Sequence, residues 1–150
     1  MKKGVRVYLG SDHAGFNVKQ KIKEYLKKRG ISYEDLSSEL IEGDDYPDVA
    51  FKVAEKVSKS KDSRGILVCG TGSGMCIASN KVKGIRAATI YDKYSAIMSR
   101  KDNNVNVACL RARRFFPRLD IRLIDLWLNT EFSHEERHKR RLAKIEKYEK

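Results

Sequence analysis

Short apolar segments of strand length alternate with longer segments of helical periodicity along almost the whole chain, and this alternation restricts the possible folds. The expected strands cover residues 5–9, 31–36, 66–68, 86–90 and 106–110. Between them, apolar residues recur three or four positions apart. Strands that alternate with helices pair in parallel through right-handed crossovers. The sequence therefore predicts one three-layer α/β/α domain over residues 1–150, with a parallel five-stranded sheet.

Local signals place the helices between these strands. Gly30 suits the end of the first helix, and Pro47 suits the first turn of the second. The apolar face of the first helix consists of Val18, Ile22, Tyr25 and Leu26. Further helices are expected over 75–82, from about Asp92, and over 119–128. In such folds ligands bind beyond the carboxyl ends of the strands.

The balance of charges favours a small anionic ligand. The chain of 150 residues has a formal net charge of +12, with 41% hydrophobic and 35% charged residues, which is typical of a globular protein. Basic excess can indicate nucleic acid, a membrane surface or an anionic substrate. Acidic residues are interspersed in the basic runs over 19–29 and 137–150, and no nucleic-acid-binding signature accompanies them. We expect neither nucleic acid nor a membrane as a partner.

Cysteine usage and the amino terminus indicate the compartment. Three cysteines, Cys69, Cys76 and Cys109, show no C-x-x-C spacing, so neither a disulfide framework nor a metal site is expected. Lys2 and Lys3 are not followed by the apolar segment of a signal peptide, and no apolar run approaches the length of a membrane span. A cytoplasmic location is therefore expected.

The turn after the third expected strand carries the strongest chemical signal. Cys69 ends an apolar strand, and every second residue after it is a glycine: Gly70, Gly72 and Gly74. Glycine permits backbone angles that let successive N–H groups converge on one point, and a helix follows. Two interpretations fit. The segment is either a tight turn with a buried cysteine, or a proton acceptor beside a site for an oxyanion.

The segment over 133–150 differs from the rest. Ser133 to Glu136 has the pattern of a capping box, and Leu142, Ile145 and Tyr148 follow at roughly helical spacing. Such a charged helix with a thin apolar stripe could dock on a second copy of the protein. The alternative is a solvated, frayed tail.

Five motifs together resemble one family. In chain order they are Gly10-Ser-Asp-His-Ala-Gly15; Asp45-Tyr-Pro47; Cys69-Gly-Thr-Gly-Ser-Gly74 with Asn80-Lys81 and Gly84-Ile-Arg86; Asn103-Asn-Val-Asn106; and Arg137-His-Lys-Arg-Arg141. The chain is similar to the type B ribose-5-phosphate isomerases, which are grouped with the galactose-6-phosphate isomerase subunits. The resemblance implies a Rossmann-like fold and a homodimer or homotetramer whose active site is shared between chains. It also implies isomerisation of sugar phosphates without metal or cofactor.

The resemblance assigns roles to individual positions. Cys69 matches the base that moves a proton between C1 and C2 of the open-chain sugar, Thr71 orients it or a sugar oxygen, and Asp12 handles hydroxyl protons. The turn would hold the enediolate through Gly70, Gly72, Ser73 and Gly74. The remaining substrate-binding positions are His13, Tyr46, Asn103, Arg113, Arg137 and Arg141. Of these, His13 and the three arginines match the phosphate-binding set, with Arg137 and Arg141 reaching across the dimer.

The chain departs from the family pattern at three places. Asp102 stands where a histidine usually helps to open the furanose ring, Arg111 replaces a common glycine, and Glu135-Glu136 replaces a glycine pair. We expect conversion of ribose 5-phosphate to ribulose 5-phosphate through a cis-enediolate. The alternatives are the same reaction on a hexose or tetrose phosphate, and a sugar-phosphate-binding protein with reduced turnover.

Overall fold

The sheet has five parallel strands, as the sequence predicts. The computed structural model describes residues 5–113 and 121–149. The strands are β1 (Arg6–Ser11), β2 (Tyr33–Asp35), β3 (Ser63–Cys69), β4 (Ala87–Thr89) and β5 (Val107–Arg111), and their order across the sheet is β2-β1-β3-β5-β4. Every neighbouring pair is parallel. The order reverses between β1 and β3, so the crevice beyond their carboxyl ends is where a ligand of such a sheet binds.

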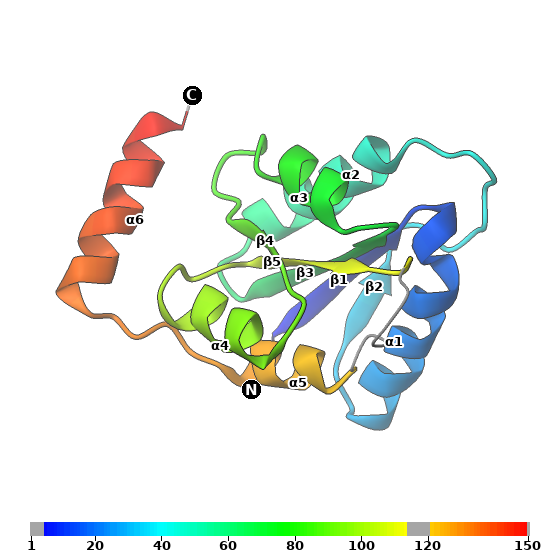
Figure 1. Cartoon of the computed structure of the whole chain (residues 1–150), viewed down its shortest axis with the longest axis horizontal. Helices are drawn as coiled ribbons and strands as arrows, with labels where there is room; N and C mark the ends of the chain where they lie inside the picture. The colour runs from blue at the N-terminus through cyan, green and yellow to red at the C-terminus, as the bar shows by residue number, and fades with distance from the viewer. Residues whose placement is uncertain (1–4, 114–120, 150) are drawn as a thin grey trace.

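Helices cover both faces of the sheet (Figure 1). They are α1 (Phe16–Lys28), α2 (Tyr46–Ser58), α3 (Ser73–Ser79), α4 (Lys93–Lys101), α5 (Arg122–Asn129) and α6 (Glu136–Tyr148), with a short 3-10 helix, η1 (His13–Gly15), before α1. Helices α1, α4 and α5 pack on one face, and α2 and α3 pack on the other. Helix α6 lies apart from both layers, beside the β4 edge (Figure 1).

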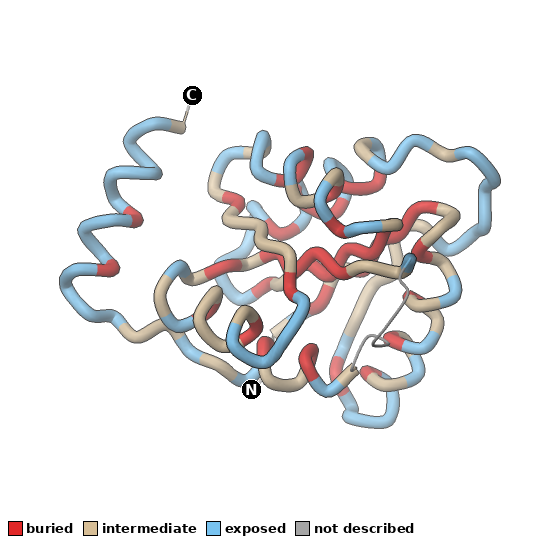
Figure 2. Tube along the Cα trace, viewed as in Figure 1, coloured by how far each residue is buried: buried red, intermediate tan, exposed pale blue. Residues whose placement is uncertain are grey.

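Two apolar clusters, one on each face of the sheet, form the core (Figure 2). On the face of α1, α4 and α5, Trp127 and Ile22 pack against Leu9 and Ile66. On the opposite face, α2 presents the stripe from Val49 to Val57 that its periodicity predicts. Both faces of the central strands are therefore buried, which is why β3 and β5 are nearly continuous apolar runs rather than alternating ones.

Element boundaries differ from the expected ones by a few residues, for identifiable reasons. Helix α3 ends at Ser79 rather than 82, where the side chain of Asn80 hydrogen-bonds to the carbonyl oxygens of Cys76 and Ala87. Helix α4 begins after Asp92, which closes a capping box with Ser95. Helix α5 begins at Arg122, and residues 119 and 120 of the expected helix lie outside the described residues.

The capping box expected at Ser133 is wrong. Helix α6 begins at Glu136 after Glu135, and no side chain caps it. His134 adopts a left-handed backbone with φ of 55°, which turns the chain, and the Ser133 hydroxyl lies 2.8 Å from Nδ1 of His138 instead. None of the helices in the described part of the chain is long and apolar enough to cross a membrane.

Candidate functional site

The Cys69 thiol lies at the carboxyl end of β3, inside the glycine turn. Cys69 is 5% exposed, and the backbone N–H of Gly72 donates a hydrogen bond to its Sγ atom at 3.2 Å. Gly72 has a φ of 83° and packs against β5, so that a Cβ atom there would lie 3.2 Å from the carbonyl carbon of Leu110. A side chain would therefore strain the backbone, and its Cβ atom would also make a tight contact with β5.

The other two glycines let larger side chains lie against the same turn. The backbone N–H of Arg113 donates to the carbonyl of Gly70 at 2.9 Å, and the Arg113 side chain crosses this glycine. The Tyr46 ring lies over Gly74, where a Cβ atom would come within 2.7 Å of Cζ. The structure thus brings both predicted binding residues to the turn that carries Cys69.

Two exposed hydroxyl side chains complete the turn. Thr71 and Ser73 are both exposed, and the backbone N–H of Ser73 donates to the Thr71 hydroxyl at 3.3 Å. They lie one and three residues beyond Gly70 on the solvent side of the turn. A bound ligand could therefore reach both hydroxyls without displacing any core residue.

Asp12 lies at the end of β1, the strand next to β3. Its backbone N–H donates to the Val68 carbonyl at 3.3 Å, and its Oδ1 accepts from the backbone N–H of Gly15 at 2.9 Å. A Cβ atom on Gly15 would lie 2.2 Å from the Val68 carbonyl oxygen, so only glycine permits η1 to approach β3 this closely. Asp12 is buried and one of its oxygens caps η1, which fixes its position beside the Cys69 turn.

His13 follows Asp12 and is held by Asp44, which lies outside the five sequence motifs. The backbone N–H of His13 donates to Oδ1 of Asp44 at 2.8 Å, and its ring Nδ1 lies 2.9 Å from the same oxygen. Asp44 directly precedes the Asp45-Tyr-Pro47 motif. In the sequence Asp44 is an acidic residue in a loop. Such residues are so common that the pattern does not mark Asp44 as a functional residue.

The remaining predicted site residues lie at the amino ends of the strands, opposite the carboxyl ends where Cys69 lies. Asp102 caps the carboxyl end of α4 and Asn103 follows it; α4 runs antiparallel to the strands because β4 and β5 are parallel. The length of β5 separates the amino ends of the strands from the carboxyl ends, where Cys69 lies, by about 15 Å. Within one chain, the structure therefore does not bring Asp102 and Asn103 to Cys69.

Arg137 and Arg141 lie on α6, which also begins near the amino ends of the strands. The backbone N–H of Ser133, just before the helix, donates to the carbonyl of Lys101 at 2.9 Å. Both arginines are exposed, and Nε of Arg137 donates to Glu135 at 2.8 Å. As residues i and i+4 of one helix they share a face, as expected from their spacing. That face is not covered by the rest of the described chain.

Helix α6 also contacts its own domain through a different face. His138 and Leu142 are buried, and the Glu149 carboxylate accepts from the backbone N–H of Gly84 at 3.1 and 3.2 Å. A cavity of about 680 Å³ lies between α6 and the β4 edge, lined mainly by apolar side chains such as Val82, Ile85 and Ile145. It is separate from the Cys69 turn.

The other two thiols lie behind the Cys69 turn, and their pKa values differ. A hydrogen bond with Cys109, helped by Thr89 and Asn80, lowers the pKa of Cys76 to about 7. The same hydrogen bond, together with burial, raises the pKa of Cys109 well above its ordinary value. All three cysteines are free thiols. No group of three or more His, Cys, Asp or Glu side chains within residues 5–113 and 121–149 could hold a metal ion.

Comparisons with known proteins agree on one family. Residues 7–145 match the family described as Ribose/Galactose Isomerase. The chain is 45% identical over 127 residues to D-erythrulose-4-phosphate isomerase of Pectobacterium atrosepticum, covering 84% of each protein. It is 41% identical over 129 residues to Ribose-5-P isomerase B of Listeria innocua, covering 86% of this chain and 87% of that protein. The crystal structure of ribose-5-phosphate isomerase B from Mycoplasma genitalium with bound ribulose-5-phosphate aligns with a TM-score of 0.92 at 41% identity, covering 99% of this chain and 98% of that one.

Proposed function

Because the chain belongs to the ribose/galactose isomerase family of sugar phosphate isomerases, we propose that it converts ribose 5-phosphate to ribulose 5-phosphate. The observation that carries this proposal is the contact at the end of β3, where the Gly72 N–H donates to the Cys69 thiol. This contact places a sulfur atom that can serve as a proton acceptor next to backbone donors for an oxyanion. The relative with bound ribulose-5-phosphate supports the choice of a pentose phosphate.

The proposed reaction moves two protons and changes no oxidation state overall. Cys69 takes the proton from C2 of the open-chain aldose, and the electrons of that C–H bond form the enediolate. N–H groups over Gly70 to Gly74 stabilise the negative oxygen, usually a large contribution to catalysis. The Cys69 thiol then returns the proton to C1. Asp12, one strand away, transfers the hydroxyl proton between O2 and O1, and Thr71 orients the reacting oxygen.

Substrate binding in this proposal requires two chains. Tyr46 lines the sugar pocket above Gly74. His13 and Arg113 hold the phosphate from the chain that carries Cys69. Asp102, Asn103, Arg137 and Arg141 come from the second chain of a homodimer or homotetramer. The separation of these residues from Cys69 within one chain, about the length of β5, supports this arrangement. The exposed face with Arg137 and Arg141 supports it too.

A tetrose phosphate is the second candidate substrate. The 45% identity to a D-erythrulose-4-phosphate isomerase favours it, as does Asp102. An ionised carboxylate accepts a proton but does not donate one, and a four-carbon 4-phosphate cannot form the furanose ring that would need opening. A cytoplasmic location, expected from the sequence, stays a prediction.

A panel of aldose phosphates tests the proposed function. Purified protein is incubated separately with ribose 5-phosphate, erythrose 4-phosphate and galactose 6-phosphate, and ketose formation is followed directly. We expect the highest kcat/KM with ribose 5-phosphate. If the value is highest with erythrose 4-phosphate instead, the tetrose phosphate replaces ribose 5-phosphate as the proposed substrate. Binding without conversion of any sugar would instead indicate a sugar-phosphate-binding protein.

A further inference from the structure

The loop that follows β2 continues the hydrogen bonding of β1 beyond the sheet. The backbone N–H of Leu36 donates to the Leu9 carbonyl at 2.9 Å. Two residues further along β1, the backbone N–H of Ser11 donates to the Ser37 hydroxyl at 2.8 Å. At His13 the partner is the carboxylate of Asp44. At Ser11 and His13, side chains of the loop thus accept the backbone hydrogen bonds that a neighbouring strand would otherwise accept. These two residues lead from the end of β1 into the candidate site.

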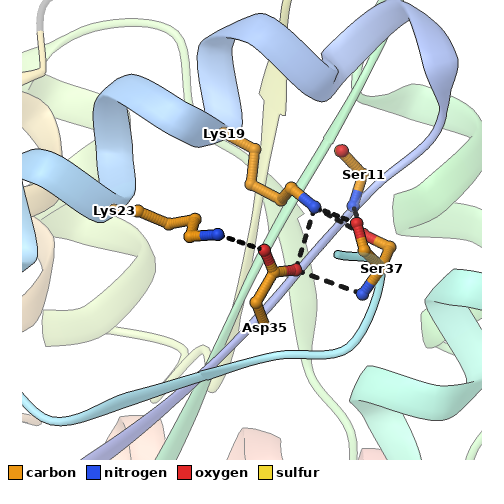
Figure 3. Close-up of polar contacts among 5 residues, drawn as sticks. All are labelled: Ser11, Lys19, Lys23, Asp35 and Ser37. Carbon is orange, nitrogen blue, oxygen red and sulfur yellow. Dashed lines mark hydrogen bonds and ion pairs between the residues drawn. The ribbon is translucent and has the colours of Figure 1, made fainter. Parts of the chain in front are cut away.

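A buried lysine anchors this loop. Lys19 of α1 is completely buried, and its ammonium group donates to Asp35 at 2.9 Å and to both the hydroxyl and the carbonyl of Ser37 (Figure 3). Burial lowers the pKa of Lys19 despite its bond to Asp35. For Asp35, burial opposes ionisation, but hydrogen bonds from Lys23 and Lys19 outweigh it and lower the pKa. The loop is therefore fixed to α1 by charged groups.

The contact between His13 and Asp44 determines which ring nitrogen faces the ligand. Asp44 Oδ1 lies 2.9 Å from Nδ1, and the two side chains are 16% and 29% exposed for Asp44 and His13. A carboxylate oxygen only accepts hydrogen bonds, so Nδ1 must carry a proton here. Nε2 is then the nitrogen left for another partner. The buried ammonium of Lys19 also attracts the Asp44 carboxylate electrostatically.

We infer that Asp44 is a positioning residue that fixes the His13 ring so that Nε2 binds the phosphate group of the substrate. This inference rests on the proposed function, in which His13 belongs to the phosphate-binding set. Binding of a phosphate dianion at Nε2 requires a proton on both ring nitrogens, so that Nδ1 donates to Asp44 and Nε2 donates to a phosphate oxygen at once. The positive ring lies between the two anions and reduces their repulsion.

The backbone bond gives Asp44 a second effect on the same segment. Because one oxygen accepts from both the His13 N–H and its ring, the main chain and the ring are fixed together. A phosphate held at one end of a sugar contributes equally to the ground state and the transition state. Loss of Asp44 should therefore raise KM and leave kcat nearly unchanged.

Three variants test the inference. Asp44→Ala should raise KM for ribose 5-phosphate and weaken binding of inorganic phosphate about tenfold, with kcat changed less than about twofold. Asp44→Asn keeps an acceptor oxygen and should show a smaller effect, about threefold. Glu42→Gln removes a charge from the same loop at an exposed position and should match the wild type in both measurements.

NMR of the His13 ring provides a readout that a purely structural role would not change. At pH 8 without ligand, long-range ¹H–¹⁵N spectra should show a proton on Nδ1 in the wild type and in Asp44→Asn. In Asp44→Ala the neutral ring should carry its proton on Nε2. An unprotonated Nδ1 in the wild type, or wild-type phosphate binding by Asp44→Ala, would overturn the inference. Neither readout needs turnover, so failure of the proposed isomerase activity is distinguishable from failure of this positioning role.

Discussion

The buried His138 ring lies with Nε2 3.6 Å from Oδ1 of Asp102, and its Nδ1 lies 2.8 Å from the Ser133 hydroxyl. His138 is 3% exposed. It joins the end of α4 to the first turn of α6. Asp102 and the two arginines of α6 are therefore held in a fixed position relative to one another. A second chain that supplies one of these groups would supply the others in a fixed arrangement.

Asp102 gives the first prediction. If its carboxylate replaces a ring-opening histidine, Asp102→His should raise kcat for ribose 5-phosphate roughly three- to tenfold, because imidazole both donates and accepts protons near neutral pH. Turnover of erythrose 4-phosphate, which cannot form a furanose ring, should change little. The ratio of the two rates is the measurement. An equal collapse of both rates in Asp102→Asn would show that this carboxylate takes part in the C1–C2 proton transfer itself.

Removal of the thiol gives the second prediction. Cys69→Ala should lower kcat by about 10³ or more, because the step loses its proton acceptor. Incorporation of solvent deuterium into the sugar should disappear with turnover, while calorimetry should show binding of ribose 5-phosphate within about threefold of wild type. Cys76→Ser, which changes a thiol behind the turn, should retain exchange. Persistent deuterium exchange in Cys69→Ala would assign the base to another residue.

Mixed oligomers give the third prediction. Cys69→Ala subunits lack the base and Arg141→Ala subunits lack part of the phosphate clamp. At ribose 5-phosphate concentrations far below the raised KM of Arg141→Ala, each variant alone should therefore be nearly inactive. If the site is shared, a mixed dimer contains one intact site, and an equimolar mixture should recover about a quarter of wild-type activity on statistical pairing, since half the dimers are mixed. Native mass spectrometry verifies subunit exchange. Exchange without recovery would count against a shared site.

The thiol of Cys76 gives the fourth prediction. Its pKa of about 7 means that about half of it is thiolate at pH 7, and that the fraction falls to roughly a tenth at pH 6. In the Cys69→Ala background, alkylation by iodoacetamide, followed by mass spectrometry, should reach half its maximal rate near pH 7. Cys109, completely buried and with a raised pKa, should stay unmodified in the folded protein. A rate at Cys76 that keeps rising to pH 9 would show that the neighbouring groups do not stabilise the thiolate.

The buried ion pair gives the fifth prediction. Lys19→Met removes the buried ammonium group that donates to Asp35 and to both oxygens of Ser37, and should lower the free energy of unfolding by about 1–3 kcal/mol at pH 7. Lys23→Met, at a partly exposed position on the same carboxylate, should cost less. Urea denaturation measures both. Equal losses would mean that burial of Lys19 adds nothing to its contribution.

The same pair predicts how stability depends on acid. The folded-state pKa of Asp35 lies below its ordinary value of 3.8, so its contribution is complete above about pH 4 and is lost as pH falls through the folded-state value. Asp35→Asn should therefore be less stable than wild type at pH 7, and the difference should shrink as the pH falls below about 4. A constant difference across this range would contradict the assigned pKa direction.

Local sequence patterns predict the sheet, the layers and the turn that carries Cys69. These depend on local patterns: apolar runs of strand length, the stripe from Val49 to Val57, and glycines at alternate positions after Cys69. Each pattern acts over a few residues, so spacing alone predicts it. The failure at Ser133 marks the limit of such reasoning, because a hydroxyl that could cap its own helix bonds to the ring of His138 instead.

Which side chains meet depends on how the whole chain packs. Asp44 reaches His13 across 31 positions of sequence, and Lys19 reaches Ser37 across 18, and neither pair has a spacing that a local pattern encodes. The tertiary structure also separated Asp102, Arg137 and Arg141 from Cys69. Helix α4, between two parallel strands, must end at the amino ends of the strands, and the hydrogen bond from the Ser133 N–H to the Lys101 carbonyl holds the start of α6 there. Long-range contacts depend on how strands and helices pack together, and that packing is a property of the whole chain rather than of any segment of it.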